Sequence, residues 1–580
     1  MNSLRILTTL SLLAAHLAFA QTPKRELRGA WIATVSRIDW PSSNSPAAQK
    51  VELTGMLDKL KSAGINSVYL QVRDECDALY QSDIEPWSSW LTGTQGKAPS
   101  PLYDPLAFAI TEAHARGMEL HAWLNPYRAE VAIGSHSKAA NHVTNLHPNW
   151  ILTFSADGLR LLNPGLPEVR DYVTSVVTDI VTRYDVDGIH FDDYFYPYSG
   201  ITTQDAATFS ANSRGITDVG DWRRDNINLL VEQVYKAIAK TRSHVKFGIS
   251  PFGIWKSGVP AGISGLSGYS AIYADALAWL NAKTVDYITP QLYWRYGGNQ
   301  DYGKLMPWWA DQVAPVKRHL YTGHAAYLAE DWGTASVVAK QVRANRDEAN
   351  CQGSILFSAV SITDNLAGML DTLKRYVYTS KALPPIMAWK DTLPPTAPRN
   401  LKYSATTDGK GTLEWEAPLA AADGDSAFMY VVYKIKSQQA NAEDFADSRN
   451  IREVLNGRTL ALTTADAGGF FFVTSLDRNA NESGPSNPGG ATVSLARISR
   501  PSADGTKVLR TSQGRFSLTF EGALPLQVDA LDLQGRVLAS LRPRKNEESL
   551  RIDGYGGIYI LQVYQADGGM SQLRVSTVKP

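Results

Sequence analysis

Short apolar segments alternate with amphipathic segments from Arg28 to about Tyr378. Eight of them have the length and composition of buried strands: Gly29–Thr34, Asn66–Arg73, Met118–Pro126, Gly188–Tyr194, Val245–Ser250, Asp286–Tyr293, His319–His324 and Gly353–Ala359. Helical spacing of apolar residues occurs between them, in Ala47–Ala63, Pro105–Arg116, Pro167–Tyr184, Trp222–Thr241 and Ala271–Ala282. Eight β/α units predict an α/β fold, a (β/α)8 TIM barrel over residues 26–380. An open doubly wound sheet is the alternative, but it would carry a Gly-rich phosphate turn after an early strand, and none is present.

The last third of the chain changes from helical to strand periodicity. Residues 381–394 are rich in proline and predict a semi-rigid linker. Short strands without helical patterns then predict a small all-β sandwich over residues 395–495. A second all-β sandwich is predicted over residues 500–580, with strands near 528–536 and 557–563. The barrel is therefore expected to be followed by two small all-β sandwich domains.

The N-terminus has the features of a secretory signal peptide over residues 1–20. A basic residue precedes the apolar run Ile6–Ala18, which is too short to span a bilayer, and Ala18-Phe19-Ala20 forms a cleavage site. The alternative is a buried N-terminal helix. No later segment has the ~20 apolar residues of a membrane helix. We therefore expect an exported protein in the periplasm, on the outer cell surface or outside the cell, with no integral membrane segment.

Composition narrows the function classes. The 57 basic and 57 acidic side chains give a net charge of +0, which argues against a nucleic-acid partner. The 15 Trp and 26 Tyr suit stacking on sugar rings, although large cores use them too. Two cysteines exclude a disulfide scaffold and a Cys-rich zinc module. Cys76 and Cys351 fall at opposite ends of the predicted barrel and are expected to be unpaired.

The fourth predicted strand carries the candidate catalytic residues. Side chains alternate along a strand, so apolar Ile189 and Phe191 should face the helices while His190 and Asp192 point into the barrel. Asp193 follows at the strand exit. Active sites of TIM barrels lie at the C-terminal ends of the strands, and a buried carboxylate there is costly unless it is paired or used. The structural alternative is a salt bridge to a neighbouring strand.

Alternation also predicts polar inward faces on other strands, including Tyr69, His121, Trp123 and Thr289. Hydrogen-bonding groups interleaved with aromatic rings suit hydroxyl-rich ligands. Each of these side chains could instead be a buried core residue whose hydrogen bonds are made within the protein. The candidate glycan-binding residues are Trp31, Gln71, Arg73, Asn125, Tyr127, Arg128, His190, Tyr194, Gln291, Tyr293 and Trp294.

If the barrel hydrolyses a glycoside, it normally needs a second carboxylate. The ends of the fifth, sixth and seventh strands contain no acid, so this group must be Asp193 or one of Asp74, Glu75 and Asp77 in the loop after the second strand. Glu75 is the preferred candidate. His190 with Asp192 and Asp193 could instead form part of a metal site, but the other histidines are scattered, so no metal or cofactor is expected.

Several motifs resemble the glycosyl hydrolase-like 10 family over residues 26–378. They are Arg28–Pro41, His121–Arg128, Asp187–Tyr196, Gly248–Trp255 and Thr289–Trp294. The resemblance implies a TIM-barrel, glycosidase-like protein of the cell envelope, with bacterial glycan strands as the leading substrate class. Against the chitinase signature, the second acid is replaced by His190 and the terminal Glu by Tyr194, so substrate-assisted chemistry with that Glu as the acid is not supported. Against the α-amylase-like fourth strand, Asp192 takes the position of the nucleophile.

The two C-terminal segments also resemble known modules. Residues 395–495 resemble a fibronectin type III module, and residues 500–580 resemble the C-terminal sorting domain of type IX secretion, which implies secretion machinery as a partner; a second accessory sandwich is the alternative. The sequence as a whole predicts a glycoside hydrolase acting on peptidoglycan glycan strands. The alternative is a non-catalytic glycan-binding envelope protein that keeps the barrel.

Overall fold

The computed structural model describes residues 22–405, 410–466 and 469–486, and then 507–512, 515–520, 523–532, 536–552, 557–566 and 570–577. The predicted signal peptide lies outside the described residues. Eight parallel strands form a closed barrel in which each pairs with its neighbours in chain order, so the predicted TIM barrel is confirmed. The strands are β1 Leu27–Ile32, β2 Ser67–Arg73, β3 Glu119–Leu124, β7 Gly188–Phe191, β8 Lys246–Ile249, β9 Tyr287–Ile288, β10 His319–Ala325 and β11 Gly353–Phe357.

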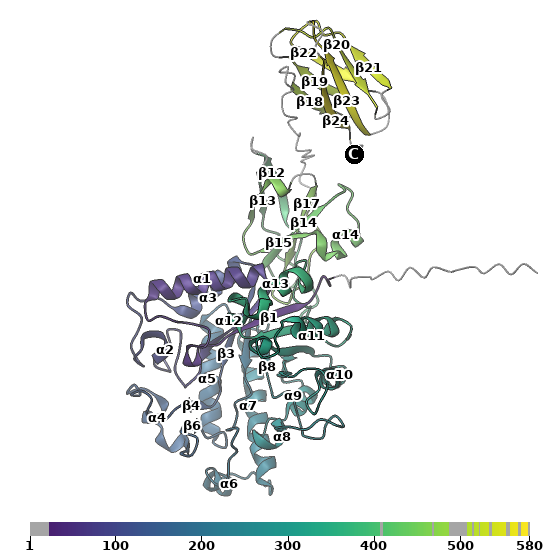
Figure 1. The fold of residues 1–580 in the computed structure, drawn as a ribbon. Helices are drawn as coiled ribbons and strands as arrows, with labels where there is room; N and C mark the ends of the chain where they lie inside the picture. The colour runs from purple at the N-terminus through teal and green to yellow at the C-terminus, as the bar shows by residue number, and fades with distance from the viewer. Residues whose placement is uncertain are drawn as a thin grey trace, which may run out of the picture.

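Helices surround the barrel, as Figure 1 shows. The main ones are α1 Pro46–Ser62, α3 Pro105–Ala115, α5 Pro167–Arg183, α7 Val219–Thr241, α9 Ala276–Ala282, α10 Tyr302–Val313 and α11 Ser336–Arg346. Shorter helices lie in the connections: α2 Ser89–Thr92, α4 Val143–Leu146, α6 Ala206–Ala211, α8 Gly268–Ala271, α12 Ala359–Thr363 and α13 Met369–Thr372. After β3, an insertion forms a three-stranded sheet of β4 Arg128–Glu130, β6 Leu159–Leu162 and β5 Ile151–Phe154.

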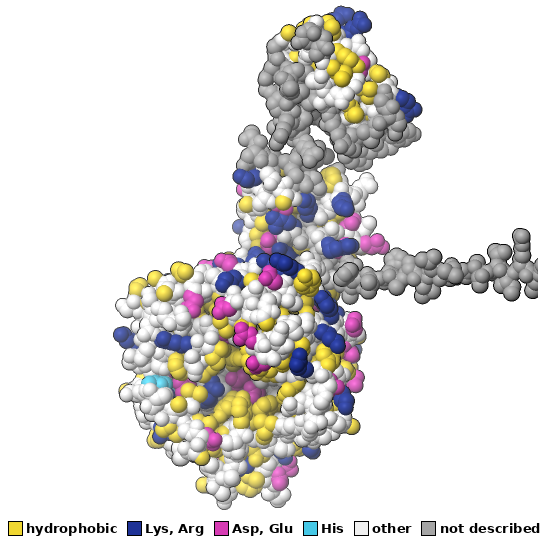
Figure 2. Space-filling view, in the orientation of Figure 1, with side chains coloured by type: hydrophobic (Ala, Val, Ile, Leu, Met, Phe, Trp, Pro, Cys, Tyr) yellow, Lys and Arg dark blue, Asp and Glu magenta, His cyan; other side chains and the backbone are white. Residues whose placement is uncertain are grey.

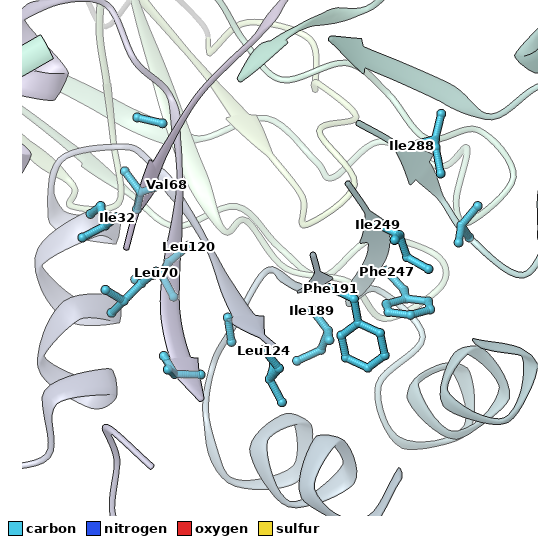
Figure 3. Packing of buried hydrophobic residues seen from close by; sticks show 14 of the residues in the cluster. Ile32, Val68, Leu70, Leu120, Leu124, Ile189, Phe191, Phe247, Ile249 and Ile288 are labelled. Carbon is cyan, nitrogen blue, oxygen red and sulfur yellow. The ribbon is translucent and has the colours of Figure 1, made fainter. Parts of the chain in front are cut away.

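The main core lies between the barrel strands and the helices. Alternate strand residues point outward into it, among them Val68 and Leu70 on β2 and Ile189 and Phe191 on β7 (Figure 3). Each of these four side chains is at most 1% exposed. Burial of an aliphatic side chain of this size stabilises the fold by ~1.5–3 kcal/mol. The outward positions expected from the alternation on β7 are therefore confirmed.

The barrel interior is filled by polar and aromatic side chains joined by hydrogen bonds. Trp31 donates to Nε2 of His190 at 3.1 Å, and the Tyr287 hydroxyl lies 3.1 Å from Nδ1 of His190 and 2.9 Å from Nδ1 of His121. Space for these rings comes from glycine. A Cβ on Gly248 would lie 2.1 Å from the Tyr287 ring. The interior is thus a packed column and not a pore, as expected for this fold.

Two predicted elements differ from the structure. β9 covers only Tyr287–Ile288 of the expected Asp286–Tyr293, because Pro290 has no N–H to donate to the ladder. The expected helix Ala271–Ala282 is split into α8 and α9, because Tyr273 has a φ of 56° and Asp275 caps the second helix. Cys76 and Cys351 are free, as expected.

The C-terminal part consists of small antiparallel sheets. The first pair has the orders β12-β13-β16 and β15-β14-β17, and the second pair β18-β19-β22 and β21-β20-β23-β24. The strands are β12 Arg399–Ala405, β13 Gly411–Glu416, β14 Met429–Ile435, β15 Ile451–Leu455, β16 Thr459–Leu462, β17 Phe470–Leu476, β18 Lys507–Ser512, β19 Arg515–Thr519, β20 Gln527–Leu531, β21 Val537–Leu541, β22 Glu547–Arg551, β23 Gly557–Tyr564 and β24 Met570–Thr577. The two small all-β regions are confirmed, whereas the specific module resemblances stay predictions.

The expectation of no helix after residue 400 is wrong, since the described residues include one short α-helix and two 3-10 turns, Ser448–Asn450 and Thr464–Asp466. Helix α14, Ala442–Ala446, begins at a capping box formed by Asn441 and Asp444. Five residues are too few to show helical periodicity in the sequence. Among the described residues, no helix has the length and apolar character needed to cross a membrane.

Residues 381–391 pack against the N-terminal end of the barrel instead of spanning a gap. Leu383 exchanges backbone hydrogen bonds with Lys24 and Glu26 at 2.8 and 2.9 Å. Met387 is 1% exposed and packs with the interior cluster, and Trp389 donates to Asp286 at 2.8 Å. Residues 381–391, which belong to the predicted spacer, therefore cover the N-terminal end of the barrel.

The first sandwich contacts this same end of the barrel. Arg478 pairs with Asp185 at 2.6 Å and with Asp187 at 3.3 Å, just before β7. Glu453 pairs with Lys61 at 3.2 Å, just before β2. Asp185, Asp187 and Lys61 each lie in the chain before the barrel strand that follows them. The first sandwich thus lies at the end of the barrel opposite to the C-terminal ends of the strands.

Candidate active site

Asp192 and Asp193 stand side by side at the C-terminal end of β7. The strand ends at Phe191, so the two following residues leave the strict alternation and both carboxylates turn to the barrel mouth. They are 8% and 5% exposed, respectively. Figure 2 shows hydrophobic side chains gathered around acidic ones near the middle of the visible face of the barrel.

Asp192 accepts hydrogen bonds from the wall formed by β3. Its Oδ1 accepts from Nδ2 of Asn125 at 3.2 Å and from the backbone N–H of Tyr194 at 3.2 Å. Its Oδ2 accepts from Nδ2 of Asn125 at 3.1 Å and from Nε1 of Trp123 at 3.2 Å. These groups can only donate. The site is therefore arranged to hold a carboxylate acceptor.

Asp193 is bound from the other side of β7. Its Oδ1 accepts from Nε2 of Gln291 at 2.7 Å, and its Oδ2 accepts from the Tyr198 hydroxyl at 2.7 Å. Gln291 also donates to the carbonyl oxygen of Ser250 at 3.1 Å. The contacts of the pair thus extend from β3 to the segment after β9.

Both carboxyl groups hold protons more tightly than free aspartate. Burial and then the neighbouring charge of Asp193 raise the pKa of Asp192 to about 6, against the opposing effect of Arg128. Burial also raises the pKa of Asp193, while the hydrogen bonds from Tyr198 and Gln291 lower it. Two adjacent carboxyls in this state can share the roles of acid and base near neutral pH.

This pKa shift predicts a pH-dependent gain in stability for Asp192→Asn. A folded-state pKa of about 6 against ~3.9 in the unfolded chain favours folding below pH ~4, and this contribution is lost as pH rises through 6. The loss amounts to at most ~3 kcal/mol. In urea unfolding, the stability of the variant relative to wild type should rise by up to this amount between pH 4 and pH 8. An equal difference at both pH values would show that asparagine acts through packing alone.

Aromatic side chains form two groups beside the pair. In the first, the rings of Tyr194 and Tyr198 lie 4.8 Å apart, and Tyr198 lies 5.3 Å from Phe252. In the second, Tyr293 lies 6.1 Å from Tyr327 and 6.2 Å from Phe357. Tyr198 and Tyr327 are 47% and 43% exposed. Partly exposed rings beside buried carboxylates suit a sugar chain.

Arg128 brings a positive charge to the mouth. Its guanidinium lies 5.4 Å from the centre of the Tyr194 ring, and its Nε donates to the carbonyl oxygen of Asp74 at 3.1 Å. Its charge lowers the pKa of Asp192 and of Asp193. Its Nη2 is buried without a hydrogen-bond partner. Asn125, Arg128, Tyr194, Gln291 and Tyr293 are thus the predicted binding residues that the structure gathers around the pair.

His190 and Trp31 lie one layer deeper. Because Trp31 donates to Nε2 of His190, that nitrogen uses its lone pair inside the barrel. The other ring nitrogen faces Tyr287. Burial lowers the pKa of His190 well below its ordinary value, so the ring is neutral. With both nitrogens engaged, His190 offers no ligand atom toward Asp192, which argues against a His/Asp metal site.

Other predicted binding residues form the walls of the site. Oε1 of Gln71 accepts the backbone N–H groups of Thr34 and Val35 at 3.0 and 2.9 Å. The Tyr127 ring is fully buried in the outer core. Trp294 packs partly buried on that same core. These three side chains shape the loops around the mouth rather than lining it.

Arg73 forms a fully buried ion pair with Glu85. Nη2 lies 2.7 Å from Oε1 and Nε lies 2.8 Å from Oε2, and both side chains are 0% exposed. Nη1 of Arg73 donates to the carbonyl oxygen of Asn125. The Tyr172 hydroxyl donates to Glu85 at 2.8 Å. Arg73 therefore joins β2 to the turn that carries Asn125.

Glu75 lies in a separate buried acidic group with Asp74 and Asp77. All three are 0% exposed, and each has one carboxylate oxygen without a hydrogen-bond partner. Glu75 accepts the Val131 N–H and lies 3.9 Å from Nζ of Lys138. Burial and then the charge of Asp77 raise its pKa. Glu75 as the second carboxylate stays a prediction, and Asp193 is the carboxyl group that directly adjoins Asp192.

Sequence reasoning missed Tyr198, Phe252, Tyr327 and Phe357. Tyr198 and Phe252 lie in loops and Tyr327 lies in the 3-10 helix Ala326–Ala329, where strand alternation carries no information. Only the aromatic run after Asp193, in Asp193-Tyr194-Phe195-Tyr196-Pro197-Tyr198, offered a signal. It predicts aromatic residues near the site without indicating which ring faces it.

Comparisons with known proteins agree with this barrel. A family model described as glycosyl hydrolase-like 10 matches residues 26–335. Glycosyl hydrolase YngK of Bacillus subtilis (strain 168) is 36% identical over 498 residues, covering 82% of this chain and 96% of that protein. Glycosyl hydrolase DigH of Escherichia coli (strain K12) is 38% identical over 374 residues, covering 59% and 84%, respectively. The glycoside hydrolase domain of PgaB (BpsB) from Bordetella bronchiseptica is similar at a TM-score of 0.40 and 13% identity, covering 61% of this chain and 99% of that domain.

Proposed function

Since this chain belongs to the glycosyl hydrolase-like 10 family, we propose that it is an exported enzyme that hydrolyses glycosidic bonds in bacterial cell-wall glycan strands. The observation that supports catalysis most is the adjacent pair Asp192 and Asp193, buried at the mouth with raised pKa values. Burying carboxyl groups in this way costs stability, which is typical of groups retained for chemistry. In this proposal Asp192 stabilises positive charge at the anomeric carbon, and Asp193 supplies the proton.

The mouth supports a polysaccharide as substrate. Two aromatic groups flank the carboxylates, and Asn125 and Gln291 place amide groups beside them. A sugar chain offers apolar ring faces for the aromatics and hydroxyl groups for the amides. Export rests on the predicted signal peptide, and attachment to secretion machinery rests on the sequence resemblance of residues 500–580.

The second candidate function is glycan binding without hydrolysis. It is favoured by the burial of Glu75, whose carboxylate accepts the Val131 N–H and lies 3.9 Å from Lys138, so that Asp193 is the carboxyl group that adjoins Asp192. Product analysis separates the two functions. Purified peptidoglycan strands, with and without stem peptides, are incubated with wild-type protein, alongside chitin and starch. New reducing ends support the enzyme, whereas retention of intact strands supports the binding module.

The aromatic groups predict a measurable loss of affinity. Removing the Tyr327 ring by Tyr327→Ala should raise the Kd for glycan strands about 2–12-fold, since a ring contact contributes ~0.5–1.5 kcal/mol. The matched control is Tyr376→Ala, because Tyr376 is 63% exposed and lies in the helical segment Leu373–Val377 just before the linker. Binding is measured by co-sedimentation with insoluble strands. Equal losses in both variants would remove Tyr327 from the binding surface.

A further inference from the structure

The two carboxyl groups at the mouth belong to consecutive residues, and this spacing limits how they can act on a sugar. Consecutive Cα atoms are ~3.8 Å apart. A glycosyl-enzyme mechanism needs two carboxyl groups flanking the scissile bond, ~5–5.5 Å apart, and inversion needs ~6.5–9.5 Å with a water between them. Asp192 and Asp193 both project from the end of β7. A sugar that binds with one face against the end of β7 has its other face directed away from both carboxyl groups.

The opposite wall is aromatic. In the barrel order, β11 lies four strands from β7 in either direction. β11 ends at Phe357, whose ring lies 6.1 Å from Trp31 and 6.2 Å from Tyr293. Asp39 lies behind this wall, and both oxygens of its carboxylate accept hydrogen bonds from groups of the protein. It accepts the Ala33 N–H at 2.7 Å, the Ser358 hydroxyl at 2.6 Å and the Val360 N–H at 2.8 Å.

We infer, building on the proposed function, that the substrate supplies the nucleophile itself and is therefore a glycan whose cleaved sugar carries a 2-acetamido group. The acetamido oxygen attacks C1, and the glycosidic C1–O bond breaks with its electron pair going to the leaving oxygen. That oxygen takes a proton from the carboxyl group of Asp193. Water then adds to C1 of the resulting oxazolinium ion, returns a proton to Asp193 and restores the acetamido group. One water is consumed, and the anomeric configuration is retained.

The hydrogen bonds of the two aspartates assign their roles. Asp192 accepts hydrogen bonds from three groups that can only donate, which are the indole N–H of Trp123, the side-chain amide nitrogen of Asn125 and the backbone N–H of Tyr194. It suits the carboxylate that binds the acetamido N–H and stabilises the oxazolinium charge. Oδ1 of Asp193 accepts from the amide of Gln291, whereas Oδ2 faces the Tyr198 hydroxyl, which can donate or accept. Asp193 can thus carry a proton or lose it without losing this partner.

The aromatic wall suits the rest of the acetamido group. Its methyl group needs an apolar contact on the side away from the carboxylates. Phe357 provides a partly buried ring on that side, between the Trp31 indole and the Tyr293 ring. The same wall offers no hydrogen-bonding carboxylate that could replace the acetamido oxygen, since the Asp39 carboxylate is bound by three donors.

The test compares glycan strands that differ only in the acyl group. Strands are de-N-acetylated and then re-acylated with either acetyl or trifluoroacetyl groups, which are similar in size while the trifluoroacetyl oxygen is a far weaker nucleophile. The expected result with wild-type protein is a kcat at least about 10²-fold lower on trifluoroacetyl strands with KM within a few-fold, and retained configuration by NMR. An equal kcat on both strands, or inversion, would overturn the inference.

Two further readouts separate this inference from the proposed function. On a 4-nitrophenyl N-acetylglycoside, whose leaving group needs no proton, Asp193→Asn should release the first equivalent of 4-nitrophenol at close to the wild-type rate, while Asp192→Asn loses this first step. A sugar bonded to Asp192, Asp39 or Glu75, found by mass spectrometry after 2-fluoro-glycoside treatment, would overturn acetamido participation while leaving the glycosidase function intact. Release of no reducing ends from any glycan would overturn both.

Discussion

Asp192→Asn is expected to lower kcat on glycan strands by at least about 10³-fold, which corresponds to ~4 kcal/mol of transition-state stabilisation. Asparagine keeps the size of the side chain but loses the charge that faces the anomeric centre. It also brings an N–H₂ group against Trp123 and Asn125, which are themselves donors. The rate is measured as reducing ends formed per minute under substrate saturation.

The matched control for this loss is Asp311→Asn. Asp311 is exposed on α10, on the outside of the barrel, so removing its charge should leave kcat within twofold of wild type. Binding of strands by Asp192→Asn should persist, because the aromatic groups are unchanged. Unchanged cleavage by Asp192→Asn would show that another group carries the charge at C1.

Glu85→Ala is expected to destabilise the protein by about 3–5 kcal/mol. The substitution leaves the Arg73 guanidinium buried without its carboxylate and removes the acceptor of the Tyr172 hydroxyl. Urea unfolding monitored by tryptophan fluorescence gives the free energy. The double variant Arg73→Met, Glu85→Leu should recover much of the loss, since a buried pair replaced by apolar side chains leaves no unpaired charge.

An exposed ion pair provides the comparison. Lys236 and Glu232 lie 2.5 Å apart on α7 with side chains 71% and 45% exposed, so Glu232→Ala should cost at most about 0.5 kcal/mol. If Glu85→Ala proved equally mild and instead weakened strand binding, Arg73 would belong to the binding surface, as the sequence suggested. A large loss of stability with normal affinity in the surviving folded protein would place it in the scaffold.

Periodicity was enough to predict the barrel and the residues of β7. Apolar Ile189 and Phe191 point into the core between strands and helices. Because side chains alternate along a strand, His190 between them lies inside the barrel. The same reasoning located the ends of the strands well enough to find Asp192 and Asp193. It failed for β9, because Pro290 interrupts the ladder within an otherwise strand-like run.

Long-range pairing was beyond the reach of the sequence. Arg73 is an inward residue by parity, but its partner Glu85 lies 12 positions later in a loop, where no period applies. Met387 and Trp389 were hidden in a proline-rich stretch that predicts a spacer, yet they pack against the barrel. In both cases tertiary contacts, which local patterns do not encode, decide the role of the side chain.

Hydrolysis of a glycan by the Asp192 and Asp193 pair is tested most directly by counting reducing ends. The substrate is purified peptidoglycan strands that have been stripped of stem peptides. Wild type, Asp192→Asn and Asp311→Asn are incubated with equal amounts of strands, and bound and released material is analysed by mass spectrometry. We expect shortened strands with wild type and Asp311→Asn, and intact, still-bound strands with Asp192→Asn. Intact strands bound by all three proteins would contradict this expectation and identify a binding protein.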